Sequence, residues 1–381
     1  MAGTTVTWEV LRELAGFRAA RGCAVSFYLD LDPRATPTAA ELDTRTRALI
    51  DEAHKGAEAV RDRRTHEQQG SVRAGLERVQ RYFDSEFSRE GVRGVAVFVA
   101  TADDLFRPVL LPVPVRDCVR VGEELYLTPL VPLADGTDGA LVAFVGRERG
   151  DLYELRDGRL EPIASRFEEQ PRRHDQGGWS QSRYQRHIDE LADRHLRGVA
   201  EELERELRAR RHAQLVLAGA EETRSEFLGL LSPDARGAIA GWTHAEAHAG
   251  ASELLAVAKP VLAKKKAEQE AELLTRWHDA LGQSSRASAG WAPTFEAASD
   301  SRVDLLLYQP NADSPVWRCP SCCRLQLEDG ACPVDGAEPE HSQEGLDLLL
   351  HTVLGRGGTA HCVTTRPDLG PVGGVGALLR F

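Results

Sequence analysis

Short apolar runs separated by long helical segments constrain the fold of this chain more than any other feature of its sequence. Apolar side chains alternate over residues 25–31, fill residues 95–100 without a break, and recur every third or fourth position over residues 184–207. Strands repeat with a period of two residues and helices with a period of 3.6. No apolar run approaches the roughly 20 residues of a membrane-spanning helix. The sequence therefore predicts an α/β or α+β protein that does not cross a membrane.

The net charge of the chain argues against nucleic acid as a general partner. The 381 residues include 47 Lys and Arg against 59 Asp and Glu, which gives a formal net charge of −12. A uniformly acidic surface repels nucleic acid, because the neutralisation of phosphates supplies most of the affinity of such complexes. Any contact with RNA must therefore come from a local basic patch, and we expect no binding to DNA.

One window is basic against this trend. Residues 171–187, with the sequence PRRHDQGGWSQSRYQRH, contain two histidines, one acidic residue and four arginines, which are Arg172, Arg173, Arg183 and Arg186. Arginine side chains at such density commonly hold the phosphates of RNA. The alternative is a solvated loop followed by an exposed first turn of a helix.

The order of the expected elements predicts three domains. The turn-forming sequence ADGTDG at residues 134–139 is the first boundary. We expect an N-terminal α/β domain at residues 1–137 and a middle domain at residues 138–257, in which helices flank a mixed sheet. A C-terminal α/β/α sandwich is expected at residues 258–381.

Four finer expectations concern the limits of elements. Two helices are expected within residues 38–90, with a break near the sequence QQGS at residues 68–71. Residues 123–133 are expected to add strands punctuated by prolines. A helix boundary is expected near Pro260, and a loop is expected over residues 282–293.

The basic window contains residues suited to positioning a water molecule. Gly177 and Gly178 release backbone restraint and let the main chain approach a partner closely. Gln181 offers one acceptor and two donors without charge, so it can orient a water and favour a developing oxyanion. Positioning of this kind lowers the barrier to hydrolysis of an activated ester. The alternative is that Gln181 is a polar residue of a first helical turn with no chemical role.

A glycine pair followed by a glutamine, on a basic loop that leads into a long helix, resembles the archaeal and eukaryotic class one peptide-chain release factors. In that family the tripeptide Gly-Gly-Gln directs water onto the ester of peptidyl-tRNA. The match here is Gly177, Gly178 and Gln181, with Trp179 and Ser180 inserted. The spacing is closer to the looser motif of the peptidyl-tRNA hydrolase of eukaryotic ribosome-associated quality control.

The flanking segments extend this resemblance over most of the chain. They are LVAFVGRERGDLYEL and LVLAGAEETRSEFLGLL around the loop, YLTPLVPL before it and SDSRVDLLLYQ near the end. The resemblance points to the bacterial branch of this superfamily. It implies a cytoplasmic partner of the ribosome that contacts rRNA of the peptidyl-transferase centre and peptidyl-tRNA, with a translational GTPase as a further partner.

The resemblance leaves two functions open. The first is hydrolysis of peptidyl-tRNA to rescue stalled ribosomes, with water positioned by Gln181. Residues 1–137 show no stop-codon motif, so rescue independent of a codon is favoured over termination. The second is a non-catalytic hibernation or splitting factor of the Pelota or Balon type. An unrelated protein whose loop matches by chance is the remaining alternative.

Four of the seven cysteines crowd into the sequence CPSCCRLQLEDGACPVDG. Cys319 and Cys322 have the spacing that lets two thiolates bind one zinc ion, and Cys332 begins a second, parallel turn. In this alignment Asp335 takes the fourth position. The sequence therefore predicts a structural Zn²⁺ site in a small ribbon at about residues 317–337, and no organic cofactor.

Two other residues compete for the fourth position, and the cluster also has an interpretation without metal. Cys323 and His341 are the alternative ligands. Without metal, the cysteines are surface thiols or the remains of a ribbon that has lost its ion. A catalytic zinc is disfavoured, because neither a group of histidines nor a general base lies nearby in the sequence.

Overall fold

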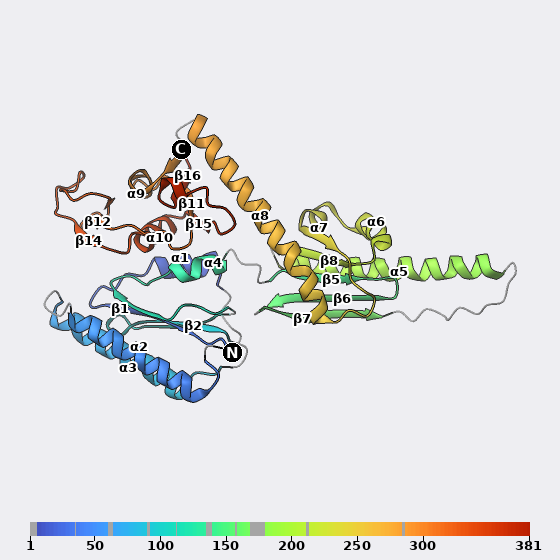
Figure 1. The fold of residues 1–381 in the computed structure, drawn as a ribbon, viewed down its shortest axis with the longest axis horizontal. Helices are drawn as coiled ribbons and strands as arrows, with labels where there is room; N and C mark the ends of the chain where they lie inside the picture. The colour runs from blue at the N-terminus through green and yellow to red at the C-terminus, as the bar shows by residue number, and fades with distance from the viewer. Residues whose placement is uncertain are drawn as a thin grey trace. The chain divides into compact units, whose positions relative to one another are not determined.

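A computed structural model gives the fold in two compact units (Figure 1). Unit 1 combines residues 1–136 with residues 270–381, and unit 2 is residues 137–269. The described residues are 6–34, 36–59, 64–89, 92–111, 113–134, 139–156, 158–167, 180–210, 213–283 and 286–381. Helices and several separate sheets occur along the chain, so the expected mixed α+β class is confirmed. The limits of the three expected domains stay a prediction.

The N-terminal lobe of unit 1, residues 6–134, is built on an antiparallel sheet of order β3-β2-β1-β4. Its strands are β1 (Ala24–Asp30), β2 (Gly94–Ala100), β3 (Leu105–Leu111) and β4 (Cys118–Gly122). The alternating side chains of β1 and β2 enter two apolar clusters, one on each face. Helices α2 (Ala39–Ala59) and α3 (His66–Ser85) cover one face, and α1 (Trp8–Ala15) lies on the other.

The expected helix break near residues 68–71 is wrong. These residues lie in α3, and α2 ends earlier, at Ala59. The reason is a capping box at Thr65. Its hydroxyl accepts from the Gln68 N–H at 3.2 Å, and the Gln68 Oε1 accepts from the Thr65 N–H at 3.0 Å. Reciprocal bonds of this kind fix the start of a helix.

The strands expected over residues 123–133 are also wrong for most of that segment. A 3₁₀ turn (Thr128–Leu130) and the short helix α4 (Val131–Ala134) occupy it. Pro129 stands in the first turn, where the N–H that proline lacks has no helical partner. Proline thus begins a helix here where the sequence pattern had indicated punctuated strands.

The C-terminal lobe of unit 1, residues 270–381, has a four-stranded sheet of order β10-β16-β11-β15. Its strands are β10 (Ala287–Ala289), β11 (Val303–Tyr308), β15 (Thr359–Cys362) and β16 (Val375–Leu379). Helices α9 (Trp291–Ser299) and α10 (Gly345–Gly355) pack against it. The loop expected over residues 282–293 is therefore wrong in part, because it contains β10 and the start of α9. Ser288 of β10 is buried and its carbonyl accepts from the indole of Trp277 at 2.9 Å, which explains the strand.

The same lobe carries a small three-stranded sheet, which we name the cysteine ribbon (residues 316–342). Its order is β13-β12-β14, with β12 (Val316–Arg318), β13 (Leu325–Gln326) and β14 (Glu340–Ser342). In these short strands Val316 and Leu325 are buried, and both belong to a larger apolar cluster of unit 1, so the ribbon has no separate core.

Unit 2 is a five-stranded sheet of order β7-β6-β5-β8-β9, in which β5, β8 and β9 are parallel. Its strands are β5 (Leu141–Val145), β6 (Arg149–Arg156), β7 (Arg159–Phe167), β8 (Leu215–Gly219) and β9 (Ile239–Thr243). Helices α5 (Ser180–Ala209), α6 (Glu221–Leu230) and α7 (Pro233–Gly237) pack into the apolar cluster on one face. The first turns of α8 (Ala251–Gln283) pack into the cluster on the other face.

The helix boundary expected near Pro260 is wrong, because Pro260 lies inside α8. Proline in a helix interior removes one hydrogen bond and leaves a carbonyl without its partner. Pro260 is exposed, so water can bind the carbonyl that it leaves unpaired. None of the helices in the described part of the chain has the length and hydropathy of a membrane span.

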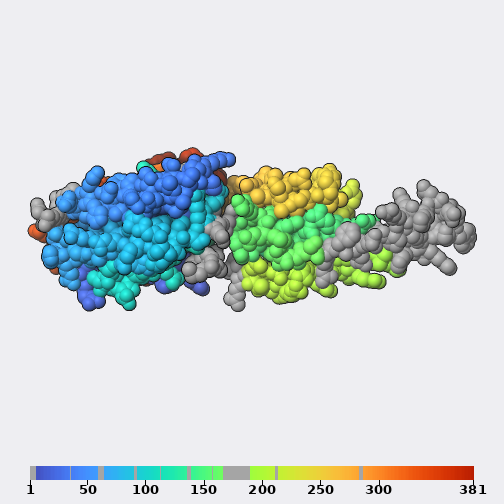
Figure 2. Space-filling view, turned by 90° about the horizontal axis from the view of Figure 1, so that it is seen from below, coloured from blue at the N-terminus to red at the C-terminus, as the bar shows by residue number. Residues whose placement is uncertain are grey.

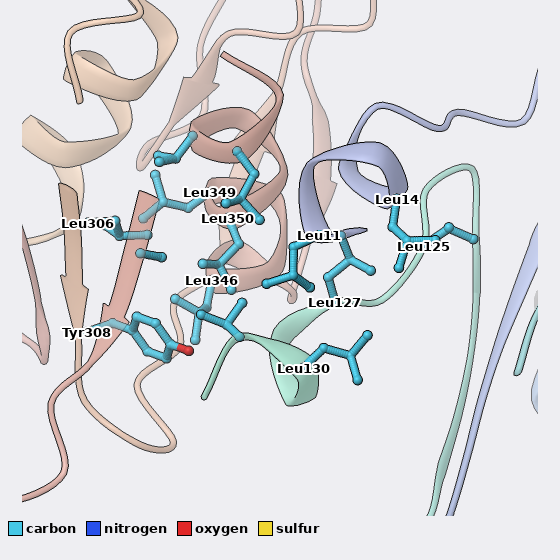
Figure 3. Close-up of a cluster of buried hydrophobic side chains, with 14 of the residues drawn as sticks. Leu11, Leu14, Leu125, Leu127, Leu130, Leu306, Tyr308, Leu346, Leu349 and Leu350 are labelled. Carbon is cyan, nitrogen blue, oxygen red and sulfur yellow. The ribbon is translucent and has the colours of Figure 1, made fainter. Parts of the chain in front are cut away.

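The two lobes of unit 1 meet through α1, residues 123–131 and α10, which together we name the lobe interface. Leucines from all three segments belong to one buried cluster (Figure 3), and its labelled members include Leu11, Leu14, Leu127, Leu130, Leu346 and Leu350. Figure 2 shows α2 and α3, in blue, over the face of unit 1 that is in view. Both helices lie on the side of the N-terminal sheet away from the lobe interface (Figure 1).

Candidate functional site

The segment that carries the predicted catalytic residues leads into α5. This helix begins at Ser180, so Gln181 and Arg183 lie in its first turn and Arg186 lies in its second. Residues 168–179, which include Gly177 and Gly178 as well as Arg172 and Arg173, lie outside the described residues.

The described part of α5 is fixed against the unit 2 sheet. Leu196, Val199 and Leu203 are buried on its inner face, at the spacing the sequence predicts. At Gly150 of β6 an added Cβ would lie 2.3 Å from the Cγ2 of Val199, so only glycine lets the helix approach this closely. Arg147, at the end of β5, lies 3.6 Å from a carboxylate oxygen of Asp189 on α5. The helix is therefore anchored to the sheet by residues 189–203.

Unit 2 also has a cavity that no sequence motif indicated. Its volume is about 760 Å³, and it lies beside the last turns of α5 and the short helix α7. The polar groups around it pair with each other. Arg208 lies 3.5 Å from Glu204, and the Gln214 amide donates to Gln269 at 3.3 Å. These two contacts involve four of the polar residues that line the cavity.

The second candidate site is the cluster of Cys319, Cys322, Cys332 and Asp335 in the cysteine ribbon. Four potential ligand atoms, one from each residue, all lie within 4.8 Å of one another. The sulfurs of Cys322 and Cys332 are 3.5 Å apart, and the Cys319 sulfur lies 3.3 Å from the Asp335 Oδ2. Two turns of the same sequence pattern thus bring together the residues that their spacing predicts.

The donor set of this cluster fits a tetrahedral metal ion. Zn–S bonds of ~2.3 Å in a tetrahedron separate two sulfurs by ~3.8 Å, close to the observed separation. The N–H of Arg324 lowers the pKa of Cys322, but burial and the Cys332 thiol raise it, with a net rise to about 12. Without a cation, therefore, these groups cannot all be ionised together at neutral pH.

Asp335 is held as a carboxylate by its own turn. The Ala337 N–H, which donates to its Oδ1 at 3.1 Å, lowers the pKa of Asp335, and the Cys319 and Cys332 thiols lower it further. A carboxylate that is ionised and oriented in this way is a ready oxygen donor for Zn²⁺.

The alternative fourth ligands have other contacts. The Cys323 sulfur accepts from the Arg18 guanidinium at 3.2 Å. Burial raises the pKa of Cys323, but hydrogen bonds from Arg318 and Arg18 outweigh burial and lower it. The ring of His341 packs on Trp317, with 4.8 Å between centroids. The geometry therefore favours Asp335 over both alternatives.

Polar residues at the lobe interface were not singled out by any sequence motif. Asp347 of α10 is 7% exposed and accepts from the Leu127 N–H at 3.0 Å and the Thr128 N–H at 3.1 Å. Burial raises the pKa of Asp347, although the neighbouring His351 opposes this rise. The only signal in the sequence was an aspartate and a histidine spaced four residues apart in an otherwise apolar helix.

A protein-family model matches the middle of the chain. Residues 126–263 match the model of bacterial archaeo-eukaryotic release factor family 10. This range contains the glycine pair and Gln181 as well as the whole unit 2 sheet. A search of curated proteins returns no match to the chain.

Several solved structures are similar at low identity. An archaeal translation termination factor, aRF1, is 16% identical, with 99% of each chain covered and a TM-score of 0.28. Pelota of Archaeoglobus fulgidus is 16% identical over 78% of this chain and 81% of its own, with a TM-score of 0.32. Dom34 of S. cerevisiae is 11% identical over 76% and 79%, with a TM-score of 0.36.

These TM-scores lie below 0.5, so the superposition of whole chains carries no argument about function. The family match is independent of them, because it rests on the sequence of one continuous range. Residues 126–263 are therefore similar to bacterial archaeo-eukaryotic release factor family 10.

Proposed function

We propose that this protein binds the ribosome and hydrolyses the ester of peptidyl-tRNA, and so rescues stalled ribosomes in the cytoplasm. The observation that carries the proposal is the family match over residues 126–263, because it encloses the segment with Gly177, Gly178 and Gln181. Support also comes from the basic character of residues 171–187 in a chain of net charge −12.

The reaction needs a positioned water more than it needs an acid or a base. Water adds to the ester carbonyl, and the ribose oxygen leaves with a proton. The Gln181 amide orients the attacking water, and Gly177 and Gly178 allow the main chain to approach the ester. The packing of residues 196–203 of α5 on the sheet supports this role, because a side chain that positions water needs a rigid base.

The arginines of the basic window hold RNA in this proposal. Arg172 and Arg173 precede the glycine pair, and Arg183 and Arg186 follow it, so all four contact phosphates of rRNA or tRNA near the peptidyl-transferase centre. Each neutralised phosphate adds to the salt dependence of binding. Replacing Arg183 and Arg186 by glutamine should therefore weaken ribosome binding and reduce its dependence on salt. A translational GTPase is the further partner that would deliver the factor.

A single-turnover assay tests the catalytic role. Ribosomes that carry labelled peptidyl-tRNA are mixed with wild-type protein, with Gln181→Ala and with Gln185→Ala. Gln185 is the next glutamine on α5, one turn later, and serves as the matched control. We expect Gln181→Ala to slow release by roughly 10²-fold, the usual cost of a misplaced reacting group, and Gln185→Ala to retain the wild-type rate.

The other outcomes separate the alternatives. Equal release by wild type and Gln181→Ala would remove the catalytic role of this residue. Cosedimentation with ribosomes in the absence of any release would favour a non-catalytic hibernation or splitting factor. A chain that neither binds ribosomes nor releases peptide would end the proposal.

We propose in addition that Cys319, Cys322, Cys332 and Asp335 bind a structural Zn²⁺ ion. Support comes from the 4.8 Å limit on the separations of their ligand atoms and from the match to tetrahedral Zn–S geometry. Bound zinc would let the three thiolates ionise together and would supply much of the folding free energy of the ribbon. Metal analysis of the purified protein tests this, with Cys319→Ser expected to lose the ion and Cys118→Ser expected to keep it. Wild-type protein purified without bound metal would exclude the site.

A further inference from the structure

The residues that flank the cysteine cluster make contacts with the N-terminal lobe. Arg318, directly before Cys319, donates to the Glu124 Oε1 at 2.7 Å. Cys323, directly after Cys322, accepts from the Arg18 guanidinium at 3.2 Å. The first pair of ligands, Cys319 and Cys322, is thus bordered on both sides in the sequence by contacts that cross between the lobes.

These contacts reach two segments of the N-terminal lobe, residues 18–19 and residues 123–124, that bind each other. The Ala19 N–H donates to the Glu123 carbonyl at 2.7 Å, and Arg18 pairs in the backbone with Glu124. The Arg18 guanidinium also binds the Glu123 carboxylate at 2.6 Å. A change at the ribbon would therefore act on both paired segments at once.

The same segment continues directly into the lobe interface. A ring nitrogen of His351 contacts the Leu125 carbonyl, and Asp347 accepts from the N–H groups of Leu127 and Thr128. Residues 123–128 therefore form one continuous stretch that runs from the ribbon contacts to α10. Contacts that fix residues 123 and 124 therefore also help to fix residues 127 and 128.

The Arg318–Glu124 pair is sensitive to any disturbance of the ribbon. The two side chains are only 19% and 14% exposed. In the described structure the Glu124 Oε2 is buried without a hydrogen-bond partner, so Arg318 supplies the compensation for this carboxylate. Removing one partner of a buried pair leaves an uncompensated charge and is strongly destabilising.

Val316 and Leu325 anchor two strands of the ribbon in the apolar core, and its other buried residues are the proposed ligands Cys319 and Cys332. Its strands have 3, 2 and 3 residues. Small sheets of this size are not stable alone, and a bound metal commonly supplies their folding free energy. Loss of the ion would therefore release the main-chain geometry at Arg318 and Cys323.

We infer that metal occupancy of the cysteine ribbon controls the docking of the two lobes of unit 1. The ion acts on residues that it does not touch. Its ligands fix the neighbouring Arg318 and Cys323, and the contacts of these two residues hold residues 123–128 in place. The inference rests on the zinc site proposed above. It goes beyond that proposal because it assigns the ion an effect on a part of the chain that contains none of its ligands.

Hydrogen exchange on the full-length protein tests the inference. Exchange is measured with Zn²⁺ bound, after chelation and after Zn²⁺ is restored, in peptides that cover residues 120–128 and residues 215–219. We expect chelation to abolish much of the protection at residues 120–128 and Zn²⁺ to restore it. Strand β8, at residues 215–219, reports global unfolding and should stay protected throughout.

Two substitutions distinguish an effect of the Arg318–Glu124 contact from general damage to the ribbon. Arg318→Met removes the contact with Glu124, so it should expose residues 120–128 while bound zinc is retained. Arg324→Met is the matched control, because Arg324 also borders the cluster but binds Asp300 at 2.7 Å in its own lobe. It should leave both zinc content and exchange at residues 120–128 unchanged.

The outcomes distinguish the inference from the metal proposal on which it rests. A protein that binds Zn²⁺ but shows the same exchange at residues 120–128 after chelation overturns the inference alone. A protein that binds no Zn²⁺ overturns the metal site and the inference with it. If Arg324→Met exposes residues 120–128 as much as Arg318→Met, the contact with Glu124 is not the link, and the inference fails.

Discussion

The centre of the unit 2 sheet is packed with apolar side chains, whereas the lobe interface of unit 1 buries titratable groups as well. Every residue of β5 and β8 is buried, and no side chain in either strand is polar. At the lobe interface, Asp347 and His351 are 7% and 5% exposed and both bind main-chain groups of the N-terminal lobe. Apolar burial is non-directional, but a buried charge depends on its partners and on pH. Contacts within unit 2 should therefore persist under conditions that open the lobe interface.

The largest effect should follow from a substitution that creates a new cavity in the core of the unit 2 sheet. Leu217 of β8 is fully buried, so Leu217→Ala should destabilise unit 2 by about 2–5 kcal/mol through lost burial and an unfilled space. The loss should be the same at pH 5 and pH 7, because no titrating group is involved. Exchange of the β5 and β8 amides measures it, with Leu281→Ala, at a side chain 38% exposed, as control. A loss that changed strongly with pH would contradict the apolar description of this core.

A smaller effect should follow from added volume in the same sheet. A Cβ at Gly219 would lie 2.2 Å from the main-chain oxygen of Val145, and a main-chain atom cannot rotate away. Gly219→Ala should therefore cost about 1–3 kcal/mol in urea unfolding, the usual range for overpacking. Gly229→Ala is the matched control, because nothing lies within 4 Å of its added Cβ in α6. It should be neutral or slightly stabilising, and equal losses for both variants would refute the steric reason.

The smallest effect concerns the charge at the lobe interface. Below about pH 3.9 the Asp347 carboxyl is protonated in the folded and the unfolded chain. Above it, the unfolded chain releases the proton while the buried carboxyl, with its raised pKa, retains it. The interface should therefore lose stability as the pH rises from about 4 through the raised pKa. Asp347→Asn should flatten this dependence, because the amide oxygen still accepts from Leu127 and Thr128.

Hydrogen exchange of the Leu127 and Thr128 amides measures the opening of the interface, after correction for the intrinsic rate at each pH. Asp304→Asn, at an exposed position of β11, is the control and should keep the wild-type dependence. The same slope for Asp347→Asn and wild type would show that the charge at residue 347 does not matter to docking.

Local patterns were enough to predict many of the elements. The alternation over residues 25–31 became β1, and the unbroken apolar run at residues 95–100 became most of β2. The period of three and four residues became α5, and the apolar run before Gly355 became α10. In each case one strong periodicity agrees with the burial that the sheet demands, so no distant contact is needed to decide the element.

Where the sequence failed, a specific local bond or a distant partner decided the outcome. The capping box at Thr65 moved a helix start, and Pro129 began a turn in place of a strand. The grouping of Cys319, Cys322, Cys332 and Asp335 could be foreseen because these residues lie close together in the chain. The lobe interface could not, because Asp347 and Leu127 are separated by 220 residues and no sequence pattern links them.

That separation has a consequence for how the protein is made. Translation at about 5–20 residues per second would leave the first lobe without α10 for roughly 10–45 s. During this interval unit 2 is translated, while the leucines of α1 and of residues 125–130 lack the apolar cover that α10 provides. Nascent chains stalled before residue 345 should therefore be the form most prone to aggregate or to engage chaperones.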